Sequence, residues 1–281
     1  MYICISTHFC SYLITIQPKP GVDAAPMALI EAGLIQQLEE DLELKVEYDG
    51  QVHSYAELVP ADDPPYRNMK QPKFCSAVTR EVSEQVYSFA KDGKMVMTLG
   101  GDHSIAIGTI SGTARAIRER LGREIAVVWV DAHADINTPE TSESGNIHGM
   151  PVAFLTGLAK DENENTFGWL KEHHLLNLNK LVYIGLRDID KGEKKILREN
   201  GIKAFSMHDI DRYVIHFFKQ TTPLDMRLIF GAQAWDWQSH GHGSRVDWKR
   251  HPNPSLLRRG CIGSYVGTQH RYAGARRSDS P

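Results

Sequence analysis

Two strand-like apolar runs in this chain each end in a cluster of aspartate and histidine side chains. Residues 95–99 lead through a Gly-Gly turn to His103, and a second run ends at Asp131, followed by His133 and Asp135. Side chains two residues apart in an extended chain point to the same face, so the last three can converge on one metal ion or on an ion pair. Three polar residues in a solvated loop are the alternative. Because ligand sites in open α/β sheets lie beyond the carboxyl ends of the strands, we expect both clusters at one edge of a sheet.

From about residue 77, the chain alternates amphipathic segments with short apolar ones, a pattern typical of βαβ units around a parallel sheet. The apolar segments predict strands over residues 95–101, 125–131, 181–186 and 202–206. The amphipathic segments predict helices over residues 78–91, 104–121, 152–158 and 193–200, with Gly201 as a C-cap. From Val214 onward this rhythm is lost, and no apolar period of either kind follows.

The length and composition favour a single intracellular α/β domain. A chain of 281 residues without an internal linker fits one large domain. Its 32 basic and 35 acidic residues nearly balance, which argues against nucleic acid or an anionic membrane as a partner. Four cysteines without C-x-x-C spacing fit a reducing compartment. The apolar residues 1–16 lack the basic start and cleavage site of a signal peptide and are too short to span a bilayer, so we expect a cytoplasmic protein.

The donor types in the two clusters indicate hydrolysis assisted by metal ions. Imidazole nitrogens and carboxylate oxygens without cysteine suit manganese, zinc or magnesium. With two carboxylates that can bridge, two ions about 3.5–4 Å apart can hold a hydroxide that acts as a nucleophile near neutral pH. His148 lies in the loop beyond the cluster and is the candidate for carrying a proton to the leaving group. Capping the start of a helix is the alternative role for His148.

Small polar side chains fill the loop between the metal cluster and His148, namely Asn137, Thr138, Ser142 and Ser144. They could hold a substrate carboxylate or merely solvate a surface loop. Asp188 and Asp190 follow another predicted strand at the same edge of the sheet. These two carboxylates could bind a cationic amine, although a structural ion pair with Arg187 is equally compatible with the sequence.

Five segments of the chain resemble the arginase family, the ureohydrolases that split arginine into ornithine and urea. They are Gln17-Pro-Lys-Pro-Gly-Val-Asp23, Gly100-Gly-Asp-His-Ser104, Asp131-Ala-His-Ala-Asp-Ile-Asn-Thr-Pro139, Ser144-Gly-Asn-Ile-His-Gly149 and Gly185-Leu-Arg-Asp-Ile-Asp190. The resemblance covers residues 17–213 and keeps the order of the family's motifs. It implies a three-layer αβα sandwich with a central parallel sheet, usually a homotrimer, with a role in arginine metabolism and the urea cycle.

The resemblance also implies a role for each residue that matches a family motif. The manganese ligands would be His103, Asp131, His133 and Asp135, with Asp131 bridging two ions per subunit. The proton shuttle would be His148. The residues that bind the substrate L-arginine would be Asn137, Ser144 and Asn146 at its α-carboxylate, and Asp190 at its α-amino group.

The C-terminal part of the chain departs from the family. The family completes its metal site with two aspartates in a late strand, written S-F-D-x-D-x-x-D-P, and no segment after Tyr213 matches this pattern. The family's late glutamate, which meets the guanidinium, is missing as well. We therefore expect one manganese ion or none to be fully bound, and an incomplete sheet with an apolar edge open to association. Residues 1–16 and 214–281 are expected to be atypical and poorly ordered parts of one arginase-like domain spanning residues 1–281.

A shifted reading frame accounts for the late departure. Codons for Leu256-Leu-Arg-Arg-Gly-Cys-Ile-Gly-Ser-Tyr265, read one base later, can spell S-F-D-V-D-A-L-D-P, the missing family motif. Residues 214–233 can begin with a GT codon and end in CAG, as a translated intron would. We interpret the late region as frameshifted after a retained intron, and the sequence of the spliced transcript tests this interpretation.

Three functions compete at this stage. The first is manganese-dependent hydrolysis of L-arginine to L-ornithine and urea by a hydroxide that bridges the metal ions. The second is a catalytically inactive arginase-like chain with an incomplete metal site, and the third is another ureohydrolase such as agmatinase. Release of urea from L-arginine, with agmatine tested in parallel, separates the three.

Overall fold

The computed structural model describes residues 2–9 and 24–220 of the chain. The chain divides into two units, the first ending at Ser206 and the second beginning at Met207. All the described strands belong to the first unit, and the described part of the second unit is helix α7 (Met207–Gln220). None of the described helices combines the length and apolar character needed to cross a membrane.

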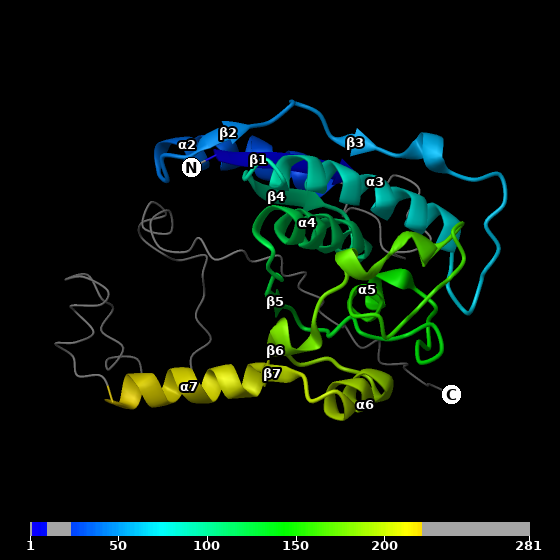
Figure 1. Cartoon of the computed structure of the whole chain (residues 1–281). Helices are drawn as coiled ribbons and strands as arrows, with labels where there is room; N and C mark the ends of the chain where they lie inside the picture. Colours follow the sequence, from blue (N-terminus) through cyan, green and yellow to red (C-terminus); the bar gives the residue numbers. More distant parts are fainter. Residues whose placement is uncertain (1, 10–23, 221–281) are drawn as a thin grey trace, which may run out of the picture. The chain divides into compact units, whose positions relative to one another are not determined.

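The first sheet is built around the N-terminal strand β1 (Tyr2–Phe9), which pairs in parallel with three others. Its partners are β2 (Lys45–Glu47), β3 (His53–Ser54) and β4 (Met95–Gly100) (Figure 1). Residues 2–9 form this strand, although they belong to the segment 1–16 that the sequence suggests is atypical, and residues 10–16 lie outside the described part. The physical reason is burial, because Ile3 and Ile5 pack with Leu38 and Leu99 in a small apolar core.

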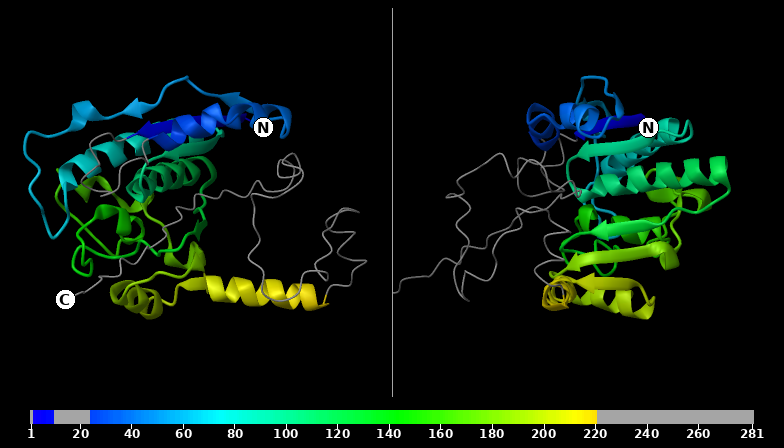
Figure 2. Two further views of the ribbon diagram at one scale, coloured as in Figure 1. Left: turned by 180° about the vertical axis from the view of Figure 1, so that it is seen from behind. Right: turned by 90° about the vertical axis from the view of Figure 1, so that its left-hand side faces the viewer.

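The second sheet is also parallel and has the order β5 (Val127–Val130), β6 (Leu181–Leu186) and β7 (Lys203–Ser206). These three strands and β4 confirm the four strands predicted from the apolar runs, with bounds that differ by two residues at most. Among the described residues, β4 and β5 share no ladder, so the expected central sheet consists of two parallel sheets. The right-hand view of Figure 2 shows β4, β5 and β6 pointing the same way, which brings their carboxyl ends to one edge.

Four helices of the first unit fall where the amphipathic segments predict them, with shifted ends. They are α3 (Pro72–Ala90), α4 (Ala106–Leu121), α5 (Pro151–Leu155) and α6 (Lys191–Glu199). The sequence analysis did not predict two further helices, α1 (Ala25–Glu31) and α2 (Leu34–Glu40). The start of α3 is at Pro72 rather than residue 78, because the Asp63 carboxylate accepts hydrogen bonds from the first-turn amides of Lys73 (3.1 Å) and Phe74 (2.9 Å). Because Asp63 lies outside the helix, its capping contact adds nothing to the periodic pattern of apolar residues from which the helix start was predicted.

Helices α3 and α4 lie side by side (Figure 1) and carry much of the main apolar core. A β-carbon at Gly112 in α4 would collide with the Ser83 carbonyl of α3, so the two helices approach more closely than larger residues would allow. The Ser111 hydroxyl donates a hydrogen bond to the Ser83 hydroxyl across this contact, at 2.9 Å. The close contact fixes α4, whose N-terminus follows the turn that carries His103.

One face of the second sheet carries exposed apolar side chains. Val128 and Val130 of β5 are 58% and 51% exposed, and Phe205 of β7 is 41% exposed. Val130 and Phe205 both pair in register with Ile184, so this apolar face runs across three strands. The loss of helical rhythm predicted from Val214 is wrong for residues 214–220, which extend α7. The shifted frame and the order predicted for residues 221–281 lie outside the described residues.

Candidate metal centre and substrate loops

Three of the four predicted metal ligands converge where β4 and β5 end. His103, Asp131 and Asp135 each offer a ligand atom, and these atoms all lie within 4.8 Å of one another. The Nδ1 atom of His103 is 2.7 Å from Asp135 Oδ2 and 3.1 Å from Asp131 Oδ2. Sequence spacing alone could not show this, because His103 follows one sheet and the two aspartates follow the other.

The turn η4 (His103–Ile105) holds the His103 ring in place. The Asp102 carboxylate caps this turn by accepting hydrogen bonds from the backbone amide of Ser104 at 2.9 Å and from its hydroxyl at 2.5 Å. The Trp129 ring meets the His103 imidazole edge-on, with 5.4 Å between the ring centroids. Backbone capping and an aromatic wall therefore leave His103 little freedom to turn away from the aspartates.

His133, the fourth predicted ligand, lies beside this group rather than in it. Its backbone amide donates to Asp131 Oδ1 at 2.9 Å, and its ring Nδ1 lies 3.4 Å from the same oxygen. The ring Nε2 atom lies 3.4 Å from Asp188 Oδ2, and the side chain is 47% exposed. Asp131 thus faces His103 with one oxygen and His133 with the other.

The carboxylates shift the pKa values of both histidines. Burial lowers the pKa of His103, but the hydrogen bond and charge of Asp135, together with the charge of Asp131, outweigh burial and raise it. The hydrogen bond to Asp131 raises the pKa of His133 to about 9, against an opposing effect of burial. For Asp131, burial raises the pKa of the carboxyl group. Hydrogen bonds from His133 and the positive charges of the His103 and His133 imidazoles outweigh burial and lower this pKa overall. A cation must displace protons from these imidazoles, so we expect metal binding to weaken as the pH falls.

The loop that carries Asp135 is anchored by hydrogen bonds and partly strained. Asp135 has a φ of 48°, a left-handed conformation that costs free energy in a non-glycine residue and often occurs at functional sites. Its carbonyl accepts a hydrogen bond from the Val152 amide at 3.0 Å. The hydroxyl of the fully buried Tyr183 donates to the Ala134 carbonyl at 2.8 Å. These contacts hold the carboxylate of Asp135 against His103.

The three converging residues His103, Asp131 and Asp135, called the triad below, fit a divalent cation. Ligands at adjacent positions of an octahedral ion with bonds of about 2.1 Å lie about 3 Å apart. The distances from His103 Nδ1 to the two carboxylates, 2.7 and 3.1 Å, are close to that separation. One imidazole nitrogen and two carboxylate oxygens form a donor set that suits manganese, zinc or magnesium.

Asn137 and Asp190, two predicted substrate contacts, form one hydrogen-bonded unit. The Asn137 Nδ2 group donates to Asp190 Oδ2 at 2.6 Å, and Asn137 Oδ1 accepts from the Thr141 hydroxyl at 2.8 Å. Asp190 also caps α6, accepting from the Glu193 amide at 2.9 Å, while the Glu193 carboxylate accepts from the Asp190 amide at 3.2 Å. The alternative left open for Asp188 and Asp190, an ion pair with Arg187, is not among the ion pairs of the described residues, and the Arg187 guanidinium donates to the Gly185 carbonyl.

The other predicted contacts lie on the turn before His148. The Ser144 hydroxyl accepts from the Asn146 amide at 3.2 Å, and Asn146 Oδ1 accepts from the ammonium of Lys70, also at 3.2 Å. His148 lies in η5 (Ile147–Gly149), which packs against the η4 turn that carries His103. All the predicted site residues therefore occupy loops that follow β4, β5 or β6.

Two residues of this region were missed by sequence reasoning. Glu193 is 4% exposed and accepts from the Ile136 amide at 3.4 Å, so it connects the Asp135 loop to α6. Burial and the charge of Asp190 raise the pKa of Glu193 to about 7. The spacing of Asp190 and Glu193 is a capping-box pattern that could have identified this role. Lys70 had no comparable signal, because it precedes Asn146 by 76 residues.

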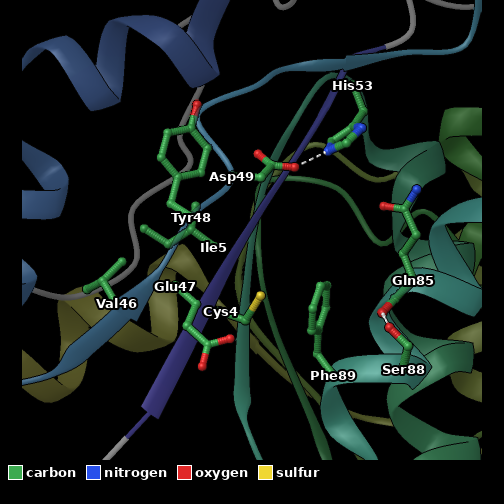
Figure 3. A pocket seen from close by; sticks show the side chains of 10 residues that line it. All are labelled: Cys4, Ile5, Val46, Glu47, Tyr48, Asp49, His53, Gln85, Ser88 and Phe89. Carbon is green, nitrogen blue, oxygen red and sulfur yellow. Dashed lines mark hydrogen bonds and ion pairs between the residues drawn. The ribbon is translucent and has the colours of Figure 1, made fainter.

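A separate cavity of about 510 Å³ lies between β1, the segment after β2, and α3 (Figure 3). Asp49 Oδ2 pairs with His53 Nε2 at 2.6 Å on its wall. Glu47, another lining residue, pairs with Lys94 at 2.6 Å. None of the predicted site residues lines this cavity, so it is distinct from the metal centre.

Comparisons with known proteins agree with the fold and with the motifs. The arginase family model matches residues 9–223. The arginase of Neurospora crassa is 70% identical over 199 residues, which cover 71% of this chain and 56% of that protein. The arginase of Coccidioides posadasii is 68% identical over 230 residues, covering 79% of this chain and 70% of that protein.

Solved structures of arginases share the fold at lower identity. A cold-adapted arginase from the yeast Glaciozyma antarctica has 41% identity and a TM-score of 0.57, covering 77% of this chain and 66% of that one. An arginase from Bacillus cereus has 32% identity and a TM-score of 0.60, covering 75% and 66% of the two chains. The chain thus spans between about half and 70% of the length of these relatives. With the family model matching most of its residues, the chain belongs to the arginase family.

Proposed function

We propose that this chain hydrolyses L-arginine to L-ornithine and urea with the help of manganese. The observation that carries the proposal is the convergence of His103, Asp131 and Asp135 within 4.8 Å, beside loops that carry the predicted substrate contacts. Membership of the arginase family supports the substrate, and the donor set supports a divalent cation. The choice of manganese, a homotrimer and a cytoplasmic location rest on the resemblance and on the composition.

Each site residue has a distinct task in this proposal. A divalent cation supplies the Lewis acidity that makes water nucleophilic near neutral pH. His103, Asp131 and Asp135 would hold the cation, and His133, beside Asp131, would serve as a further ligand. The oxygen of water adds to the guanidinium carbon, and the bond from that carbon to the side-chain nitrogen of arginine breaks. A proton that the water gives up passes through His148 to the leaving nitrogen, so that urea and ornithine form.

The substrate loops orient the amino-acid end of arginine. Asn137, Ser144 and Asn146 offer neutral donors to the α-carboxylate, and Asp190 offers a carboxylate to the α-amino group. The link of 2.6 Å between Asn137 and Asp190 holds the two recognition groups at a fixed separation before substrate binds. Such preorganisation lowers the entropic cost of placing the guanidinium carbon beside the activated water.

The test is an assay of urea and ornithine with the full chain, manganese and L-arginine, run in parallel with agmatine. We expect urea from L-arginine and at least a hundredfold loss of kcat/KM in Asp135→Asn, because the triad loses a charged ligand. Glu164→Gln is the matched control, since Glu164 pairs with Lys171 away from the site. Manganese bound to the chain without release of urea would contradict the proposal, and a preference for agmatine would identify an agmatinase.

A further inference from the structure

The segment before α3 packs against the loop that carries the predicted α-carboxylate contacts. The backbone amide of Lys70 donates to the Gly145 carbonyl at 2.9 Å, and the Lys70 ammonium donates to Asn146 Oδ1 at 3.2 Å. Backbone and side chain of one lysine therefore contact successive residues of the Ser144–Asn146 turn. This contact joins residues 76 apart in the sequence, and Lys70 lies outside the five segments that resemble the family.

The local backbone fixes the position of Lys70. Asn68 Nδ2 donates to the carbonyls of Pro139 (3.2 Å) and Ser142 (2.7 Å). Both carbonyls lie in the loop over residues 137–146, called the substrate loop, which carries the predicted carboxylate contacts. Met69 is fully buried. Asn68 and Gln71 have φ values of 63° and 48°, so two left-handed residues flank the Met69–Lys70 pair. Lys70 thus projects from a segment held on both sides, although its side chain remains exposed.

The charges around the site leave a role for this ammonium group. Asp190 brings negative charge directly against Asn137, and the predicted carboxylate contacts Asn137, Ser144 and Asn146 are themselves neutral. Arg67, on the same segment, already pairs with Glu140 at 2.5 Å. Within the described part of the chain, no carboxylate lies within ion-pair distance of Lys70. Its positive charge is therefore available to a ligand carboxylate.

We propose that Lys70 is a specificity-determining residue that selects ligands bearing an α-carboxylate. The inference rests on the proposed function, because it takes the Ser144–Asn146 turn as the carboxylate subsite. Lys70 contributes in two ways: its charge attracts the carboxylate, and its hydrogen bond to Asn146 Oδ1 directs the donor Nδ2 group of that amide away from Lys70. Ligands with the same amines but without the carboxylate gain nothing from either effect.

The test compares L-ornithine with putrescine, which has the same two amines and lacks the carboxylate; neither is hydrolysed. Dissociation constants are measured by isothermal titration calorimetry on the full chain with manganese, for wild type, Lys70→Met and Lys70→Arg. We expect Lys70→Met to weaken L-ornithine binding about five- to tenfold and to leave putrescine within twofold, as for loss of one charged contact. Lys70→Arg should keep most of the preference.

Lys73→Met is the matched control, because the Lys73 ammonium lies on the same segment and donates to the Asp62 carbonyl at 3.1 Å. An equal loss for both ligands in Lys70→Met would show a purely structural role and overturn the inference. Wild-type protein that binds L-ornithine selectively but releases no urea from L-arginine would defeat the proposed function while leaving the role of Lys70 standing. Wild-type protein that does not prefer L-ornithine to putrescine would defeat both.

Discussion

Histidines in this chain show how the neighbours of a side chain set its protonation. His103 and His133 lie against carboxylates, which raise the pKa of each ring. His174 is 6% exposed, and burial together with the charge of His173 lowers its pKa to about 4. The His174 Nδ1 atom accepts from the Lys171 amide at 3.1 Å, and among the described residues its buried Nε2 atom has no hydrogen-bond partner. Protonation of His174 therefore opposes folding.

Replacing His174 should flatten the pH dependence of stability. The unfolded ring binds a proton below a pKa near 6.5, whereas the folded ring binds one only near 4. The contribution of neutral His174 to the stability of the folded state is thus fully present above pH 6.5. This contribution decreases by up to roughly 3 kcal/mol as the pH falls to 4. Urea denaturation of wild type and His174→Gln between pH 4.5 and 7.5 measures the difference. His208→Gln, at an exposed site, serves as control, and parallel curves for wild type and His174→Gln would refute the assignment.

At the scale of elements, the N-terminus of α6 is built against the substrate loop. A β-carbon added to Gly192 would lie 2.8 Å from Asn137 Oδ1 and 3.1 Å from the Thr141 β-carbon. The absence of a side chain at Gly192 therefore lets the helix start come close enough for Asp190 to hold Asn137 at 2.6 Å. One helix terminus thus determines the geometry of two predicted substrate contacts, Asn137 and Asp190.

The substitution Gly192→Ala should weaken substrate recognition although alanine favours helices. The gain in helix propensity is about 1 kcal/mol, whereas overpacking costs about 1–3 kcal/mol, so we expect a small net loss of stability. Displacement of Asn137 should lower the affinity for L-ornithine about tenfold, as measured by calorimetry. Lys195→Ala, an exposed change in the same helix, should leave both quantities unchanged. Unaltered affinity in Gly192→Ala would mean that Asn137 tolerates movement or does not contact the ligand.

At the scale of the first unit, the candidate metal centre connects two sheets that share no ladder between β4 and β5. His103 follows β4 in one sheet, and Asp131 and Asp135 follow β5 in the other. A cation held by all three residues would tie the carboxyl ends of the two sheets together. Because the ligands lie close only in the folded state, binding of the ion adds to folding stability.

Manganese should therefore raise the thermal unfolding midpoint of the chain. At a free concentration a hundredfold above the dissociation constant, one ion adds about 2.7 kcal/mol, equivalent to about 5–10 °C for a unit of this size. Differential scanning calorimetry with and without manganese, before and after chelation, measures the shift. Asp135→Asn should abolish most of it, and Glu164→Gln should keep it. A shift that survives in Asp135→Asn would place the stabilising ion elsewhere. Metal analysis should find one tightly bound ion per chain rather than two.

Local sequence pattern was enough to predict much of this molecule. The runs ending at Gly100, Val130, Leu186 and Ser206 form strands because short apolar runs bounded by turn residues favour strands, and that preference is local even where side chains such as Val130 and Phe205 stay exposed. The motif at Asp131, His133 and Asp135 predicts a metal site because residue type and spacing carry the donor chemistry. The strand at residues 2–9 was missed, because its burial depends on Leu38 and Leu99 far along the chain.

The parts of the fold and of the site that the sequence pattern did not predict depend on contacts between residues far apart in the chain. Packing turned His133 toward Asp188 and left three of the four predicted ligands together. The link from Lys70 to Asn146, the cap that Asp63 places on α3, and the fit of Gly192 against Asn137 join segments whose separation follows no period. Periodicity reports which face of an element is buried, whereas the partner that covers this face depends on how the elements pack in three dimensions.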